Sequence, residues 1–163
     1  MKQLFLSEYD SSMLQPYGCL PCGEPLLYPP FGEHKQWKVA KPFLYISRRG
    51  WGVEIEDSFL SDLASIPRLL RIFYGVNKRE TCGAVIHDHG YRNRFKPRYN
   101  VLTGYSCILS RAEWDEILYD ACRLGGTNKF RAWSIYRGVR LGGWVAWYHY
   151  NKEYTLPKSL DED

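Results

Sequence analysis

The pattern of apolar and polar positions changes character partway along the chain. Residues 43–47 and 51–59 alternate as half-buried strands do, and the turn residues around Gly50 between them indicate a hairpin. From Ala64 onward the apolar positions take helical spacing. We therefore expect an α+β fold, in which a small antiparallel sheet in the N-terminal half is followed by three to four packed helices.

Caps and helix breakers set the bounds that we expect for these helices. Proline at a first helical position and a Ser-x-x-Glu capping box mark two of the starts, and a Gly-Gly pair marks one end. The expected helices begin at Ser65-Ile66-Pro67, run from about Thr81 to Pro97, from Ser110 to about Leu124, and from about Thr127 to Tyr148, with a loop or short hairpin at 98–109. In the last helix Ser134, Gly138, Gly142 and Ala146 repeat every four residues, which would let another backbone approach closely.

Length and local composition divide the chain into one domain with two flanking segments. A chain of 163 residues suits a single domain and buries roughly 70% of its unfolded surface, enough for a core without disulfides or metals. Residues 1–36 are rich in Pro and Tyr without a periodic run, and we interpret them as an irregular arm or a set of short strands. Residues 37–152 would form the α+β domain and residues 153–163 a polar, acidic tail.

The composition favours large aromatic contact surfaces. Aromatic residues make up 16% of the chain and hydrophobic residues 45%, a share more common in buried and interfacial surfaces than in polar solution enzymes. The formal net charge is +4, and because Lys and Arg are spread along the chain, no nucleic-acid interface is expected. We expect no transmembrane segment, since the most apolar late stretch, residues 144–150, is too short.

The cysteines indicate a reducing compartment. There are five, an odd number, and Glu8 and Asp10 follow the first residues too soon for the apolar core of a signal peptide. We therefore expect synthesis in the cytoplasm with mostly free thiols. Cys19 and Cys22 have the spacing of half a zinc or redox site, but no second half follows, and a Pro-rich surface loop is the alternative.

The most distinctive polar residues are His87 and Asp88, which follow an apolar run in the second expected helix. At about 100° per residue, both share one stripe with Ala84 and Tyr91, while apolar residues cover the opposite side. A helix that is apolar almost all round is buried, and a buried His-Asp pair is costly unless it has partners. The pair is therefore either a structural network or a reaction centre.

Asp115, on the next expected helix, is the candidate third member. If the two helices pack antiparallel, its carboxylate can accept a hydrogen bond from one nitrogen of His87. The other nitrogen would then face a water molecule, which makes His87 a candidate general base. In the alternative, Asp115 caps its helix or pairs with Arg92 or Arg111, and His87 is a satisfied core histidine.

Asp88 would then be available to a hard cation such as Ca²⁺, which would polarise an ester carbonyl. Asp62 is a second candidate ligand, although Asp before a helix is also a common cap or turn residue, and Arg68 would pair with one of the two carboxylates. His89 points about 160° away from His87 on the helix, and we exclude it from the site.

Three ordered motifs carry a first resemblance. They are SDLASIPR at 61–68, AVIHD at 84–88 followed by Tyr91, and SRA at 110–112 followed by Asp115, and the match continues to Arg140 and Gly142-Gly143-Trp144 in the last helix. Over roughly residues 40–147 the chain resembles an uncharacterised family encoded by tailed phages and prophages. The resemblance implies a phage origin and not an activity. A structural role would give the chain other phage structural proteins as partners and a place in the virion after synthesis in the host cytoplasm.

A second resemblance is confined to residues 82–122. The segments CGAVIHDHGYRN and SRAEWDEILYDAC are similar to the paired helices of bacterial and fungal secreted phospholipase A2 enzymes. This resemblance implies that His87 is the base, that Asp88 binds calcium, that Asp115 orients the histidine, and that Tyr91 supports the pair. No clear glycine-rich calcium loop precedes the helix here, and the expected reducing compartment differs from that of those enzymes.

Two functions remain. The first is a structural component of a phage particle, in the tail or baseplate, with His87, Asp88 and Asp115 as a buried network. The aromatic content, the Pro-rich arm and the lack of a signal peptide favour it. The second is a small phospholipase- or esterase-like hydrolase that acts on the cell envelope, with envelope lipid as its substrate; a hydrolase carried in the virion would satisfy both. It would use His87 as base, Asp115 and Tyr91 as supports, and Ca²⁺ on Asp88 and Asp62.

Overall fold

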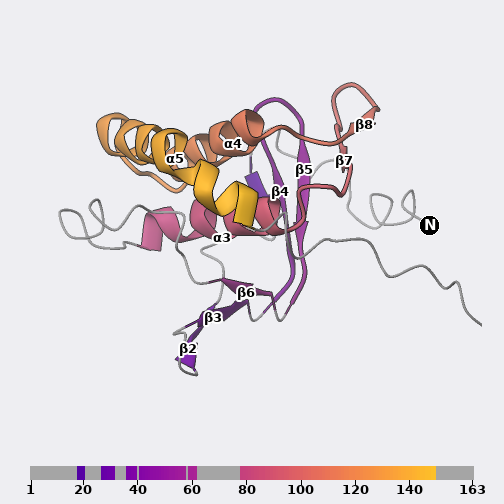
Figure 1. Cartoon of the computed structure of the whole chain (residues 1–163). Helices are drawn as coiled ribbons and strands as arrows, with labels where there is room; N and C mark the ends of the chain where they lie inside the picture. The colour runs from indigo at the N-terminus through magenta and orange to yellow at the C-terminus, as the bar shows by residue number, and fades with distance from the viewer. Residues whose placement is uncertain are drawn as a thin grey trace, which may run out of the picture.

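The computed structural model describes residues 18–20, 27–31, 36–39, 41–57, 59–61 and 78–149. In Figure 1 the strands of the N-terminal half lie beside the helices of the C-terminal half. The long helices are α3 (Lys78–Arg92), α4 (Arg111–Leu124) and α5 (Lys129–His149), and α3 packs against both α4 and the strands. The expected α+β fold, small antiparallel sheets followed by helices, is confirmed.

The sheet nearest the helices has the strand order β1-β4-β5, with all neighbours antiparallel. Its strands are Gly18–Leu20, Phe43–Ile46 and Gly52–Ile55. The last two form the expected hairpin, whose register pairs Phe43 with Ile55. Gly50 in the turn has a φ of 84°, where a Cβ would also collide with Leu102, so glycine is what allows this turn.

A second small sheet has the order β2-β3-β6. Its antiparallel strands are Leu27–Phe31, Gln36–Val39 and Leu60–Ser61. The register shifts between Tyr28 and Phe31, where two prolines have no amide proton to give to the ladder. Strands β1 and β2 lie within residues 1–36, so the described parts of that segment are short strands, which was one of the two interpretations.

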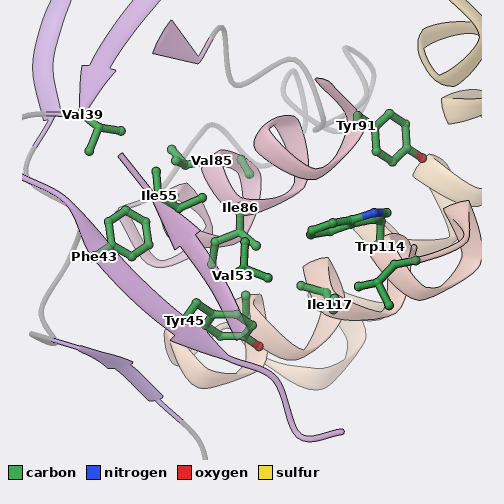
Figure 2. Close-up of a cluster of buried hydrophobic side chains, with 13 residues drawn as sticks. Val39, Phe43, Tyr45, Val53, Ile55, Val85, Ile86, Tyr91, Trp114 and Ile117 are labelled. Carbon is green, nitrogen blue, oxygen red and sulfur yellow. The ribbon is translucent and has the colours of Figure 1, made fainter. Parts of the chain in front are cut away.

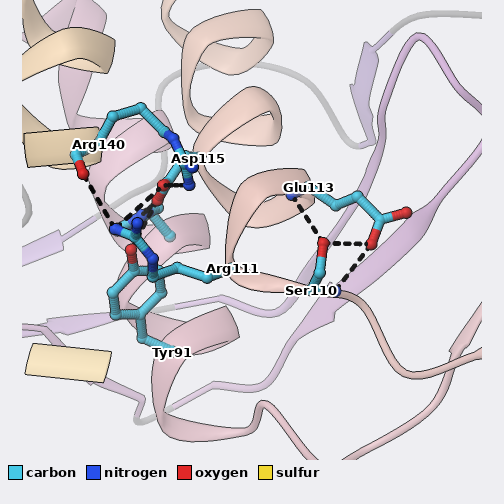
Figure 3. A network of polar contacts seen from close by, with 7 residues as sticks. Tyr91, Ser110, Arg111, Glu113, Asp115 and Arg140 are labelled. Atoms are coloured by element: carbon cyan, nitrogen blue, oxygen red, sulfur yellow. Dashed lines mark hydrogen bonds and ion pairs between the residues drawn. The ribbon is translucent and has the colours of Figure 1, made fainter. Parts of the chain in front are cut away.

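Helix α4 begins where the sequence predicts because its capping box is complete. The Ser110 hydroxyl accepts a hydrogen bond from the Glu113 amide, and the Glu113 carboxylate accepts one from the Ser110 amide at 2.7 Å (Figure 3). The segment before it forms a short hairpin of β7 (Arg98–Tyr99) and β8 (Ser106–Cys107), one of the two expected alternatives.

Helix α3 ends earlier than expected, at Arg92 rather than at Pro97. Its last turn is closed by Asn93, whose backbone and side-chain amides both donate to the carbonyl of His89, at 2.9 and 3.1 Å. The proline therefore follows the helix end and does not cause it. The helix expected from Ser65 lies outside the described residues.

The largest core lies between the β4–β5 hairpin and helices α3 and α4. Figure 2 shows the hairpin side chains directed at α3, with Trp114 and Ile117 of α4 closing the far side. Strand alternation places Val53, Ile55 and Asp57 on one face of the hairpin; Val53 and Ile55 are fully buried, whereas Asp57, beyond the strand end, is exposed. Residues 83–91 of α3 are all buried, which confirms a helix enclosed almost all round.

Helices α3 and α4 run antiparallel. Gly83 near the start of α3 lies against Leu118 and Cys122, whereas Gly90 near its end lies against the indole of Trp114. An added Cβ at Gly90 would come within 3.0 Å of the Trp114 ring, so glycine permits the close approach. The packing on which the predicted contact between His87 and Asp115 depends is therefore present.

Helix α5 packs on α4 through a narrow stripe. Its buried residues are Ala132, Ile135 and Val139. The close approach expected at Gly142 is wrong, because a Cβ there would meet nothing within 4 Å; Gly143 faces the contact instead. None of the helices in residues 78–149 is both long and apolar enough to cross a membrane.

Candidate polar site between three helices

The candidate site is centred on the fully buried carboxylate of Asp115. His87 of α3 reaches it across the antiparallel helix pair, with Nε2 2.9 Å from Oδ1. Both side chains lie in the interior, since His87 is 2% exposed and Asp115 0%. The predicted pairing of these two residues is present.

Tyr91 stands one helical turn after His87 and binds the same carboxylate oxygen. Its hydroxyl donates to Asp115 Oδ1 at 2.6 Å, and its ring centroid lies 4.0 Å from that of His87. Trp147 of α5 also contacts the Tyr91 ring, in an edge-on arrangement with the ring centroids 4.9 Å apart. The phenol is thus fixed by packing as well as by its hydrogen bond.

The second oxygen of Asp115 faces two arginines. Arg140 of α5 donates to Oδ2 at 2.8 Å, and Arg111, one turn before Asp115, lies 3.7 Å from the same oxygen. Arg111 also donates to the Arg140 carbonyl at 3.3 Å. Figure 3 shows Tyr91, Arg111 and Arg140 gathered around Asp115. Donors from α3 and α5 and a nearby cation of α4 therefore meet at one carboxylate.

The surroundings of Asp115 and Tyr91 determine which of the two is charged near neutral pH. Burial raises the pKa of Asp115, but the hydrogen bonds from His87 and Tyr91, with the charge of His87 and the bond from Arg140, outweigh it and hold the pKa below its usual value. Burial, and then the contact with Asp115, raises the pKa of the Tyr91 hydroxyl. Asp115 is therefore an ionised acceptor and Tyr91 a neutral donor.

The cluster falls within the segment shared with a known protein family. Residues 37–139 match the family model described as "Protein of unknown function (DUF1353)". The chain belongs to this family. No curated protein and no solved structure matches the chain significantly. The DUF1353 segment contains His87, Asp88, Tyr91 and Asp115, and it ends one residue before Arg140.

Asp88, the candidate calcium ligand in this DUF1353 segment, lies outside the Asp115 cluster. Its Oδ2 accepts a hydrogen bond from the Ser61 hydroxyl of β6, and the residue is 7% exposed. Asp62 and Arg68 lie outside the described residues, so a cation site shared by Asp88 and Asp62 stays a prediction. Among the described residues, no group of three or more His, Cys, Asp or Glu side chains is arranged to hold a metal ion.

His89 has separate partners, as its helical angle predicts. Its Nε2 lies 2.9 Å from Glu56 Oε2, and Arg98 approaches Nδ1 at 3.5 Å. Burial and the neighbouring Arg98 charge lower the pKa of His89 to about 4. His89 is therefore neutral at physiological pH and holds the β5 end against α3 rather than joining His87.

Arg140 is the member of the cluster to which sequence reasoning gave no role. It belonged to the match with the phage family, and it borders the buried stripe of α5, where a long cationic side chain can reach inward. Arg92, one of the partners considered for Asp115, donates instead to the Leu60 carbonyl at 2.6 Å. Arg111, the other, lies at the edge of the cluster.

Three of the described cysteines are free thiols. Cys82, Cys107 and Cys122 form no disulfide, and burial raises the pKa of the Cys122 thiol to about 12, with a smaller contribution from Glu80. Cys19 lies in β1, and Cys22 lies outside the described residues. A half-site at Cys19 and Cys22 therefore stays a prediction.

Proposed function

We propose that this DUF1353 protein is a structural component of a phage particle, in its tail or baseplate. The observation that carries the proposal is the position of Asp115 on α4, whose buried carboxylate binds donors from α3 and α5. A buried charge is stable only when its partners are in place, so this cluster fixes how the three helices pack. Such a cluster suits a rigid part of an assembly.

The resemblance to phage-encoded proteins supports a phage particle as this assembly. The high aromatic content supports the same proposal, because aromatic side chains are enriched where proteins contact one another. The two resemblances agree on His87 and Asp115 and differ only in what the pair is for.

The proposal is tested on particles from a phage or prophage that encodes the chain. Particles are purified on a density gradient, washed with protease and nuclease, and quantified by mass spectrometry against a known tail protein. We expect the chain at a fixed number of copies per particle. Its absence from intact particles would refute the proposal.

A second function is supported by the geometry of His87. A carboxylate that binds one imidazole nitrogen fixes the ring and its tautomer, which is how a general base is oriented in hydrolases. Here Asp115 binds Nε2 at 2.9 Å, with Tyr91 on the same oxygen, as the resemblance to phospholipase A2 implies. In this alternative the protein hydrolyses ester bonds of envelope lipids, and Asp88 and Asp62 hold Ca²⁺.

Fatty-acid release from phospholipid vesicles separates the two functions. The purified chain is incubated with vesicles in Ca²⁺ or in a calcium chelator, beside His87→Gln and the control His149→Gln, which changes an exposed histidine. The hydrolase predicts release that needs Ca²⁺, is lost in His87→Gln and persists in His149→Gln. No release by the folded wild-type chain under either condition would exclude it.

A further inference from the structure

Helix α5 carries a second apolar face, opposite the one that it buries. Six large apolar side chains on it are each more than half exposed: Phe130, Trp133, Leu141, Trp144, Val145 and Tyr148. At about 100° per residue they fall within a stripe about 120° wide that points away from Ala132, Ile135 and Val139. We call these six residues the outer face of α5.

The outer face has the size of one side of a protein interface. From Phe130 to Tyr148 it is about 27 Å long at about 1.5 Å per residue. Because an aromatic side chain offers about 150–250 Å², the exposed parts of the four aromatic residues alone come to roughly 350–580 Å², and Leu141 and Val145 add to this area. The outer face is therefore as large as the largest patch of a typical monomer, about 300–600 Å², and approaches the roughly 800 Å² that each partner contributes to a standard interface.

The charged residues of α5 indicate what kind of molecule could bind the outer face. Residues 121–149 contain no Asp or Glu. Two arginines of α5 are turned inward, since Arg131 pairs with Glu80 at 2.7 Å and Arg140 with Asp115 at 2.8 Å. Arg137 instead lies in the middle of the outer face, 5.8 Å from the Trp133 ring centroid, and no described carboxylate pairs with it.

We propose that the outer face of α5 docks on an apolar surface of another protein that places a carboxylate opposite Arg137. A second copy of this chain fits poorly, because a two-fold pairing of α5 would bring two Arg137 side chains together without an acidic residue on either face. A lipid surface also fits poorly. Membrane-surface helices keep their cations on the polar side, whereas here the cation lies within the apolar face and two others are bound internally.

The proposal rests on the proposed function, in which the partner is another protein of the particle. Four variants test it: Leu141→Ser, Trp144→Ser, Arg137→Glu and Arg137→Lys, each compared with the wild type for copies per particle. Leu124→Ser is the matched control, since Leu124 is an exposed leucine that belongs to α4 and not to the outer face of α5. The altered side chains are exposed, so thermal unfolding should stay close to that of the wild type.

Truncating a side chain at the centre of an interface should lower incorporation by about tenfold or more, as for interface hot spots. We expect this for Leu141→Ser and Trp144→Ser, a larger loss for Arg137→Glu than for Arg137→Lys, and no loss for Leu124→Ser. Suppose that the wild-type chain is found in particles and that both serine variants are incorporated at the same number of copies. This result would overturn the docking proposal but leave the proposed function intact. Absence of the wild-type chain would overturn the proposed function and this partner with it.

Experiments on the purified chain test three other possible occupants of the outer face: a second copy of the chain, a lipid surface, and residues 150–163. Light scattering should find a monomer, and flotation should find no binding to vesicles of phosphatidylcholine and phosphatidylglycerol. A dimer, or vesicle binding, that is lost in Trp144→Ser would assign the face to a second copy or to lipid and overturn the proposal. Hydroxyl-radical footprinting should oxidise Trp133 and Trp144 equally with and without residues 150–163. Protection by that segment would make it the occupant instead.

Discussion

Substitution of the adjacent glycines of α5 tests the contact that joins this helix to the polar cluster. A Cβ at Gly142 would meet nothing within 4 Å. A Cβ at Gly143 would lie 2.8 Å from the Tyr91 hydroxyl and 3.2 Å from Val139 Cγ1. Gly142→Ala is therefore a matched control for Gly143→Ala, with the same chemical change one residue away in the same helix.

The two substitutions should change the free energy of unfolding in opposite directions. Alanine is favoured over glycine inside a helix by about 1 kcal/mol, so Gly142→Ala should raise the free energy of unfolding by up to that amount. Gly143→Ala has the same gain, but Tyr91 cannot easily move, because its ring contacts both His87 and Trp147 and its hydroxyl binds Asp115 at 2.6 Å. Overpacking costs about 1–3 kcal/mol and loss of a hydrogen bond to a charged group about 1.5–3 kcal/mol. After the helix gain is subtracted, the net loss should be about 1.5–5 kcal/mol.

Urea unfolding followed by circular dichroism measures both variants. A change of 1 kcal/mol corresponds to about 2–4 °C in Tm for a chain of this size, so thermal unfolding should separate them clearly. In the double variant with Tyr91→Phe the hydroxyl is gone, and the two losses should fall short of additivity by about 1 kcal/mol. Equal stabilisation by Gly142→Ala and Gly143→Ala, or strict additivity with Tyr91→Phe, would refute the contact.

Three further predictions concern other parts of the fold. Burial and Arg98 lower the pKa of His89 from 6.5 to about 4, so between these pH values the unfolded chain takes up a proton that the folded chain does not. The contribution of His89 to the free energy of unfolding is therefore present above pH 6.5 and falls by about 3 kcal/mol by pH 4. Urea unfolding across this range should show a shallower loss in His89→Gln, and an equal loss would contradict the reasoning. Glu80→Ala leaves Arg131 without its buried partner and should cost about 3–5 kcal/mol in urea unfolding; a cost below about 1 kcal/mol would show that the pair is not needed. Ser110→Ala removes the α4 cap and should cost about 1 kcal/mol in thermal unfolding, whereas Ser110→Asp should retain most of it.

The parts of the fold that were predicted well depend on neighbours in the sequence. The hairpin follows from alternation around a turn that needs glycine at Gly50, and α4 from a capping box within four residues. The sequence predicts an end of α3 at Pro97, the first proline after the apolar run. In the structure Asn93 already closes the last turn. A proline limits how far a helix can run, but it does not show where an earlier cap ends it.

The candidate site was predicted in part for the same reason. The helical period places His87 and Tyr91 on one side of α3, and the apolar stripe of α4 brings Asp115 toward them. The approach of Arg140 depends on how α5 crosses α4, and on the lack of a side chain at Gly143, which no local pattern encodes.

By itself, the sequence determined the class of fold, the enclosed helix α3, and the need of its buried His-Asp pair for polar partners. These features follow from alternation, caps and helical period, which act over a few residues. Only the tertiary structure decided the allocation of partners. Asp115 binds His87, Tyr91 and Arg140, while Asp88 accepts from Ser61. It also decided which face of α5 remains exposed. These outcomes depend on the competition between distant groups for one buried carboxylate, and that competition is settled only when the helices pack.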